Sequence, residues 1–288
     1  MRILLPKYLK SVKDVDLMNF NIHQCNSVNA TDIYVNFNNL EFLSPYGVIS
    51  LLLSLESTMN NEPLNLNVAA DKMNLKVLSY LERINFFQLL PIEIKNQFYE
   101  QTILGDLELR GRYDRSKHLL EITPIREEND VENICEKIYN ICSILPNSKV
   151  CNDIAQISLE LANNIIDHSD GYGYINIQYY SLNNTIRIAI ADNGIGLVNR
   201  SRSLMPPNTS ELEILENAFK NGSTTRTETQ RGQGLGNVRN CSFNGYIENT
   251  KLTLKSGNNF FNLSQESISI NPSEFYYPGT YYDFIISV

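Results

Sequence analysis

The side chains of Glu160 and Asn164 lie four residues apart in a stretch whose apolar residues recur at helical spacing. Residues four apart share one face of a helix, so both side chains can act on one ligand. The carboxylate can orient or deprotonate a water molecule, and the amide oxygen can bind a hard cation such as Mg²⁺. Asp167 and His168 follow one turn further on. Taken alone, the same pattern fits a solvated polar helix face that ends in a capping histidine.

Two glycine-rich turns follow along the chain. The first reads Asp192-Asn193-Gly194-Ile195-Gly196 and ends a strongly β sequence. Its aspartate can accept a hydrogen bond from an amino group of a ligand, and its glycines allow the backbone to approach that ligand closely. An aspartate, an asparagine and a glycine in succession are also common in ordinary turns, so this segment alone decides nothing.

The second turn reads Gly232-Gln233-Gly234-Leu235-Gly236 and leads into a helical pattern from Leu235 to Ser242. A helix N-terminus presents free backbone N–H groups and the positive end of the helix dipole, which together favour phosphate. A dinucleotide-binding interpretation fails, because no strand-like segment directly precedes the turn. The polar stretch from Asn199 to Arg231, with a helical segment from Ser210 to Lys220, is typical of a mobile lid.

The elements that must position these groups follow from the spacing of apolar residues. Asp153 to His168 is expected to form a helix, and an earlier helix is expected from Val131 to Leu145. Two strands follow, Tyr174 to Tyr180 and Thr185 to Ala191, with a hairpin turn at Asn183-Asn184. The expected order is therefore two helices and then two strands, and the second strand leads into the first glycine turn.

The first hundred residues alternate between strand-like and helical segments. Strands are expected over Thr31 to Asn38 and Leu64 to Val68. A helix is expected after Ser44-Pro45, which supply an N-cap and a first-turn proline, and another from Leu75 to Ile84. This order predicts a small α/β layer. The stretch from Gln97 to Arg126 reads as irregular or as short strands and is the expected domain boundary.

Composition excludes several classes of protein. The chain has 288 residues, of which 42% are hydrophobic, so we expect two folded domains. A net charge of −8 argues against nucleic acid as the main ligand. No stretch has the length and apolarity of a secretion signal or a membrane span, which predicts a cytoplasmic protein with no membrane partner. The five cysteines form no CxxC pair, so reduced thiols are expected.

A Glu-x-x-x-Asn helix, a DxGxG turn and a GxGxG turn, in this order, resemble the ATP-binding domain shared by gyrase, heat-shock chaperone, histidine kinase and MutL proteins. These are the GHKL ATPases, which have the Bergerat fold. The similarity covers Glu128 to Val288, and Gly279-Thr280 resembles the closing Gly-Thr element of the family. The resemblance implies an α/β (α+β) protein, with a two-layer sandwich of mixed sheet and helices over residues 126–288.

The resemblance also implies a site for ATP and Mg²⁺. Glu160 would be the general base or water-orienting residue for hydrolysis, and Asn164 would bind the Mg²⁺ that bridges the phosphates. Asp192 would accept a hydrogen bond from the adenine amino group, with support from Thr280. The other positions implied to contact the nucleotide are Asp167, His168, Gly194, Ile195, Gly196, Gly232, Gln233, Gly234, Leu235 and Gly236.

Residues 1–125 resemble the anti-sigma-factor-antagonist (STAS) domain in their order of strand, Phe-Leu-Ser-Pro-Tyr-Gly turn, helix, strand and helix. In that family a serine or threonine of the turn is phosphorylated in regulated members. Here Ser44 stands at the aspartate position and Pro45 at the acceptor position, and proline cannot be phosphorylated. The resemblance therefore implies docking or dimerisation rather than a phosphorylation switch.

Three functions stay open on these residues. The first is an ATPase that converts ATP to ADP and uses lid closure to switch a dimer or a partner-protein interface, and Glu160 favours it. The second is an anti-sigma-type serine/threonine kinase that acts on a separate partner, which His168 favours. The third is a non-hydrolysing, nucleotide-gated binding module. A sensor histidine kinase ranks lowest, because only His23 and His118 lie upstream and His118 precedes a strand-like segment.

Overall fold

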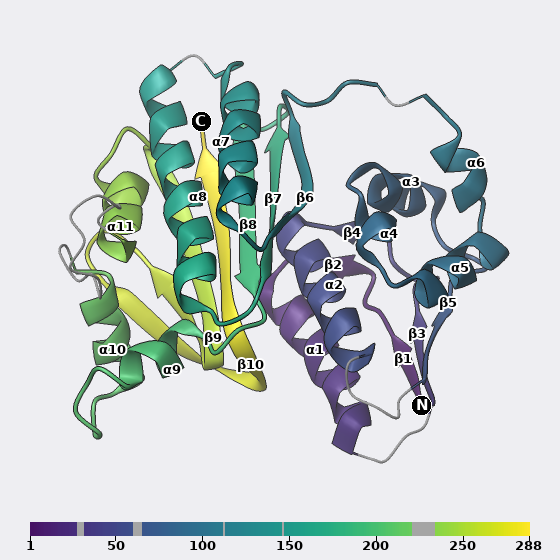
Figure 1. The fold of residues 1–288 in the computed structure, drawn as a ribbon, viewed down its shortest axis with the longest axis horizontal. Helices are drawn as coiled ribbons and strands as arrows, with labels where there is room; N and C mark the ends of the chain where they lie inside the picture. The colour runs from purple at the N-terminus through teal and green to yellow at the C-terminus, as the bar shows by residue number, and fades with distance from the viewer. Residues whose placement is uncertain (28–31, 60–64, 112, 146, 221–233) are drawn as a thin grey trace. The chain divides into compact units, whose positions relative to one another are not determined.

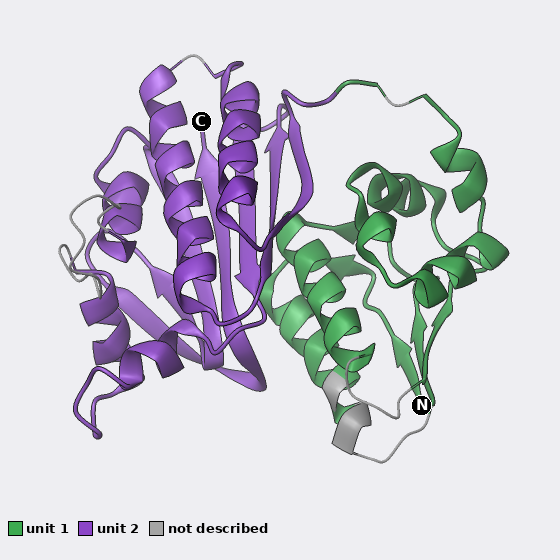
Figure 2. Cartoon of the chain, in the orientation of Figure 1, with its two compact units in different colours: residues 1–114 green, residues 115–288 purple. Residues whose placement is uncertain are grey.

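The chain divides into two compact units, Met1–Asp114 and Arg115–Val288, which Figure 2 shows in different colours. The sequence instead places the boundary after residue 125. The difference arises because the strand Leu119–Ile125 (β6) pairs with Gly173–Tyr180 (β7) and so joins the second unit. The computed structural model describes residues 1–27, 32–59, 65–111, 113–145, 147–220 and 234–288.

The N-terminal unit contains a parallel three-stranded sheet in the order β1–β3–β5, and a parallel pair of short strands, β2 and β4. The predicted alternation of strand and helix is confirmed. The hydroxyl of Ser44 accepts a hydrogen bond from the N–H of Gly47 at 3.3 Å, as expected of an N-cap. The elements are β1 (Arg2–Leu4), β2 (Tyr8–Leu9), α1 (Val12–Ser27), β3 (Asp32–Asn36), β4 (Phe42–Leu43), α2 (Pro45–Met59), β5 (Asn65–Ala69), α3 (Leu75–Arg83), α4 (Phe86–Leu89), α5 (Ile92–Gln101) and α6 (Leu104–Glu108).

Helices α5 and α6 correct the interpretation of the stretch from Gln97 to Arg126 as irregular or as short strands. The side chains of Gln97 and Gln101 explain the difference. Their amide oxygens accept hydrogen bonds from the backbone N–H groups of Val68 and Ala70, at 2.7 and 2.8 Å. Side chains of α5 thus supply hydrogen-bond acceptors for the backbone N–H groups at the edge of β5. This is a tertiary contact, which the local pattern of apolar residues cannot predict.

The C-terminal unit has a five-stranded sheet in the order β6–β7–β8–β10–β9, and α7, α8 and α11 lie over one of its faces (Figure 1). This arrangement confirms the two-layer sandwich. Every neighbouring pair of strands is antiparallel, which corrects the expected mixed sheet. Besides β6 and β7, the elements are α7 (Glu128–Cys142), α8 (Ser148–His168), β8 (Thr185–Asp192), α9 (Leu197–Arg202), α10 (Glu211–Ala218), α11 (Leu235–Phe243), β9 (Asn249–Leu263) and β10 (Ile268–Ser287).

The hydrophobic core of this unit fills the space between the sheet and the helices. Ile188 and Ile190 of β8 are fully buried and belong to the same cluster as Ile157 and Leu161 of α8. Alternate residues of β8 therefore point to the helices, as the two-residue period predicts. The hairpin β7–β8 that the sequence predicts at Asn183-Asn184 is confirmed. These contacts fix α8 on the sheet by its apolar face.

Four of the five cysteines have described side chains. Cys135, Cys142, Cys151 and Cys241 are free thiols, and the last three are buried. Buried free cysteines act mainly as small apolar side chains. Within the described part of the chain, no helix combines the length and the apolar character needed to cross a bilayer.

The close approach of α2 to β2 gives a test of the N-terminal unit. A Cβ atom at Gly47 would overlap the carbonyl group of Leu9. Gly47→Ala is therefore expected to lower the free energy of unfolding by about 1–3 kcal/mol, as overpacking does. Denaturant unfolding followed by circular dichroism measures the change.

Gly105→Ala in α6 is the matched control. A Cβ there would meet only the ring of Tyr99, at an ordinary contact distance of 3.8 Å. Alanine is the better helix former, so this variant should be neutral or more stable by up to about 1 kcal/mol. Equal destabilisation by both substitutions would contradict the packing of α2 on β2.

Candidate functional site

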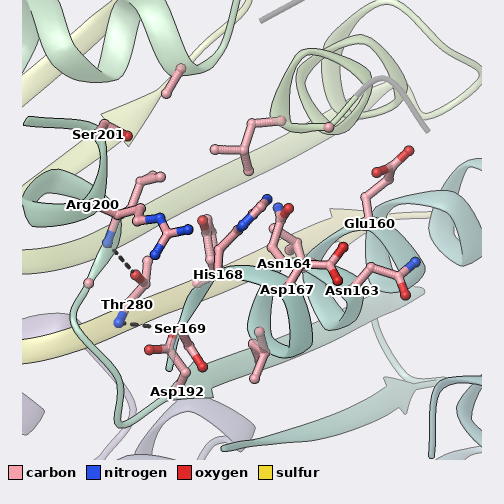
Figure 3. Close-up of a pocket in the computed structure, with 18 of the residues that line it drawn as sticks. Glu160, Asn163, Asn164, Asp167, His168, Ser169, Asp192, Arg200, Ser201 and Thr280 are labelled. Carbon is pink, nitrogen blue, oxygen red and sulfur yellow. Dashed lines mark hydrogen bonds between the residues drawn. The ribbon is translucent and has the colours of Figure 1, made fainter. Parts of the chain in front are cut away.

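A cavity of about 740 Å³ lies in the C-terminal unit, beside the face of α8 that carries Glu160 and Asn164. Its volume falls within the range of roughly 300–1,000 Å³ usual for small-molecule sites. Figure 3 shows side chains from α8, from the end of β8 and from β10 gathered around it. The sequence-predicted residues that line it are Glu160, Asn164, Asp167, His168, Asp192, Gly196, Gly234, Leu235 and Thr280.

Helix α8 brings the first motif to this cavity. The side chain of Asn147 caps its start by accepting a hydrogen bond from the N–H of Lys149 at 3.0 Å. The apolar stripe through Leu161 packs into the core, and Glu160 and Asn164 lie beside this stripe on one face of the helix. Both polar side chains therefore stand on an element that is held rigidly by its buried side.

Asp192 is the last residue of β8 and is only 5% exposed. The N–H of Gly194 donates to its Oδ1 at 2.9 Å, and the N–H of Thr280 donates to its Oδ2 at 3.2 Å. Burial raises the pKa of Asp192 to about 7, while the hydrogen bonds from Gly194 and Thr280 act in the opposite direction. The carboxyl group is thus fixed in direction and poised between its two protonation states near neutral pH.

The first glycine turn is attached to the end of α8. The N–H of Ile195 donates to the carbonyl oxygen of Ser169 at 2.9 Å, and a Cβ atom at Gly194 would overlap that same carbonyl group. Gly196 has a φ of 79°, in the region that favours glycine, and caps α9. Gly194 and Ile195 do not line the cavity. They hold the turn in place, which positions Gly196 at the cavity wall.

Strand β10 completes this side of the site. The hydroxyl oxygen of Thr280 accepts a hydrogen bond from the N–H of Leu197 at 2.8 Å. The hydroxyl of Tyr277 donates to the backbone carbonyl oxygen of Asp192 at 2.6 Å. Sequence reasoning missed Tyr277, because the pairing of β9 and β10 shifts register on both sides of it and no local pattern reveals its direction. Thr280 and Tyr277 together tie the end of β8 to β10.

The second glycine turn reaches the cavity through its last part. Gly234 has a φ of 63° and caps α11, and Gly234 and Leu235 line the cavity. Gly236 is buried and does not line it. Gly232 and Gln233 lie outside the described residues. The N-terminus of α11 therefore opens onto the cavity, as the phosphate-binding hypothesis requires.

The cavity has an acidic rim and an apolar wall that the motifs did not reveal. Arg200 is the only lysine or arginine among its described lining residues, and it forms an ion pair with Asp170 at 3.6 Å. Five of the lining side chains are acidic, namely Glu128, Glu132, Glu160, Asp167 and Asp192. The apolar wall includes Val131, Leu197, Leu204, Met205, Ile214 and Tyr282.

The donor set of α8 fits a hard divalent cation. Amide and carboxylate oxygens, which Asn164 and Asp167 supply, are the ligands that Mg²⁺ prefers. The surrounding acidic rim would repel an anionic ligand that arrived without a counter-charge. Asn164 therefore fits the role of an Mg²⁺ ligand that the sequence resemblance implied.

The cavity thus joins a Glu–Asn helix face, a buried aspartate at a strand end and the N-terminus of a glycine-capped helix. Residues 150–261 match the family of histidine kinase-, DNA gyrase B- and HSP90-like ATPases. A comparison with curated proteins finds no match to the chain. The match confirms the GHKL resemblance for this part of the C-terminal unit and supports an ATP-binding function of the ATPase or kinase type. The STAS resemblance of residues 1–125 stays a prediction.

The raised pKa of Asp192 predicts how stability depends on pH. Its folded-state value of about 7 lies above the unfolded value of about 3.9, so the folded protein binds this proton more tightly. This contribution to stability is present below about pH 4 and is lost as the pH rises to about 7. Asp192→Asn removes it.

Urea unfolding of both proteins between pH 5 and 8 measures the effect. The free energy of unfolding of the wild type, relative to that of Asp192→Asn, is expected to fall by a few kcal/mol over this range, at about 1.4 kcal/mol per pKa unit. A difference that does not change with pH would contradict the desolvated state of Asp192.

Proposed function

We propose that the C-terminal unit binds ATP with Mg²⁺ and hydrolyses it to ADP and phosphate. The observation that carries this proposal is that Glu160 and Asn164 of the helix motif and Asp192 of the first glycine turn line one cavity. The family match over residues 150–261 supports the nucleotide as the ligand. Hydrolysis is favoured over binding alone because a carboxylate, Glu160, stands on the same helix face as the proposed metal ligand.

The nucleotide base is assigned to the end of the cavity that contains Asp192. Two backbone N–H groups hold its carboxylate in one direction, so it can accept a hydrogen bond from the exocyclic amino group of adenine. Leu197, Ile214 and Tyr282 supply apolar surface for the faces of the purine ring. The phosphates would then extend toward the N-terminus of α11 at Gly234 and Leu235.

The hydrolytic step is assigned to Glu160. Its carboxylate would take a proton from a water molecule as the water oxygen attacks the terminal phosphorus, and the bond from that phosphorus to the bridging oxygen would break to release ADP. Asn164 would hold Mg²⁺, which neutralises phosphate charge when it is bound. Asp167 and His168, one turn further along α8, would contact the phosphates or their cation from the same side.

A protein kinase of the anti-sigma type is the second candidate function. It is favoured by the position of His168, which lines the cavity from the last turn of α8. In that case the terminal phosphate would pass to a serine or threonine of a partner protein instead of to water. The cytoplasmic location, the partner or dimer interface, and lid closure over residues 199–231 stay predictions. Residues 221–231 of the lid lie outside the described residues.

Turnover of Mg-ATP by the purified protein tests the proposal. Glu160→Gln removes the base but keeps the size of the side chain, so ADP production should fall by about 100-fold or more, as the loss of a general base does. Nucleotide affinity, measured in parallel by calorimetry, should change by less than about threefold. Removal of Mg²⁺ with a chelator should weaken ATP binding, since the acidic rim would then face bare phosphate.

Glu132→Gln is the matched control, because Glu132 lines the same cavity and belongs to its acidic rim, but stands on α7 and has no part in the assigned hydrolytic step. It should keep wild-type turnover. The kinase would be favoured if every variant bound ATP without turnover and phosphate were transferred only when a partner protein was present. Turnover that Glu160→Gln leaves intact would contradict the assignment of the base.

A further inference from the structure

The side chain of Asn237 contacts the carboxylate to which hydrolysis is assigned. Its Nδ2 donates a hydrogen bond to Oε1 of Glu160 at 3.2 Å. Asn237 stands in the first turn of α11, directly after the glycines of the second turn, whereas Glu160 stands on α8. One side-chain contact thus links the N-terminus of α11 to the helix that carries the base.

A second contact one turn away holds the same two helices together. Sγ of Cys241, four residues after Asn237, donates to Oε1 of Gln156, four residues before Glu160, at 3.1 Å. The i, i+4 spacing on each helix places both contacts along one line between α8 and α11. The register of the two helices is therefore set at two successive turns.

The thiol of Cys241 also lies beside the amide of Asn237. Sγ of Cys241 lies 3.8 Å from Oδ1 of Asn237, so the oxygen of the amide faces the thiol and the nitrogen faces Glu160. Burial, together with the nearby carboxylates of Asp153 and Glu160, raises the pKa of the Cys241 thiol to about 11. The thiol therefore keeps its proton at neutral pH and can donate it to Gln156.

An amide suits this place chemically. It donates to a carboxylate without adding charge, so it orients Glu160 and leaves it available as a base. A lysine or arginine here would pair with the base and lower its basicity, and a carboxylate would repel it. Burial of Val238 keeps α11 on the core, so the helix does not depend on the contact between Asn237 and Glu160.

We propose that Asn237 is the positioning residue for Glu160, and that it couples the orientation of the base to the place of the phosphate-binding turn at the start of α11. The inference rests on the proposed function, since it concerns the same hydrolytic step. The hydrogen bond fixes the carboxylate of Glu160 relative to the N-terminus of α11. Asn237 acts through Glu160 and does not line the cavity.

Asn237→Ala tests this role through kcat, KM and the pH profile. Loss of one hydrogen bond to a charged group should lower kcat by about tenfold or more, while ATP affinity changes by less than about threefold. The hydrogen bond favours the ionised carboxylate, so its loss should move the acidic limb of the kcat profile to higher pH. Asn237→Asp should move this limb further in the same direction, because it places a like charge beside Glu160.

Asn240→Ala is the matched control. Asn240 is also an asparagine of α11, but its Oδ1 accepts a hydrogen bond from Asn244 and it has no contact with Glu160. It should leave kcat and the pH profile unchanged. Circular dichroism of the variants checks that α11 and the sheet are kept.

A double substitution separates this inference from the proposed function. In the Glu160→Gln background, Asn237→Ala should cause no further loss of turnover, because the group that it orients is absent. Turnover that depends on Glu160 but is unchanged in Asn237→Ala would overturn the positioning role of Asn237 and leave the proposed function intact. An equal loss from Asn237→Ala in both backgrounds would also overturn it, by showing a merely structural role. Absence of turnover in the wild type would overturn the proposed function as well.

Discussion

The antiparallel pairing of β8 with β10 is the constraint on which the rest of the site depends. Its register sets Ala191 opposite Tyr281, so Asp192 and Thr280 meet at the same end of the two strands although they are 88 positions apart. Asp192 lies on the same face of β8 as the core residue Ile190, which explains both its burial and its raised pKa. A slip of one residue would turn Asp192 to the other face and dismantle the site.

Helix α8 carries Glu160 and Asn164 and also contacts both glycine turns. Its apolar side is fixed in the core, and its polar side presents Glu160 and Asn164 to the cavity. The first glycine turn binds back to the end of α8 through Ser169, and α11 binds to its middle through Asn237. The proposed base, the proposed metal ligand and the two turns are therefore held by one helix, as the proposed function requires.

Local sequence patterns predicted most of the helices and strands, because helical and strand periods report burial directly. The shared helix face of Glu160 and Asn164 could be predicted, because the two residues are four positions apart. Tyr277 and Asn237 could not, since each acts through a contact with a residue far away in the sequence. The helix α5 was missed for the same reason: the glutamines that satisfy the edge of β5 have no signature in their own segment. Similarly, the alternation of apolar residues within a strand does not show whether neighbouring strands pair parallel or antiparallel, and the family resemblance implied a mixed sheet.

The central claim is that Asp192 binds the amino group of adenine, and calorimetric titration with ATP and with inosine triphosphate at pH 8 tests it most directly. The two nucleotides differ in one exocyclic group of the purine ring, which is an amino donor in ATP and a carbonyl acceptor in inosine triphosphate. The carboxylate of Asp192 should pair with the first and be left unpaired beside the second, so ATP should bind at least about tenfold more tightly. Equal affinities for the two nucleotides would contradict the account.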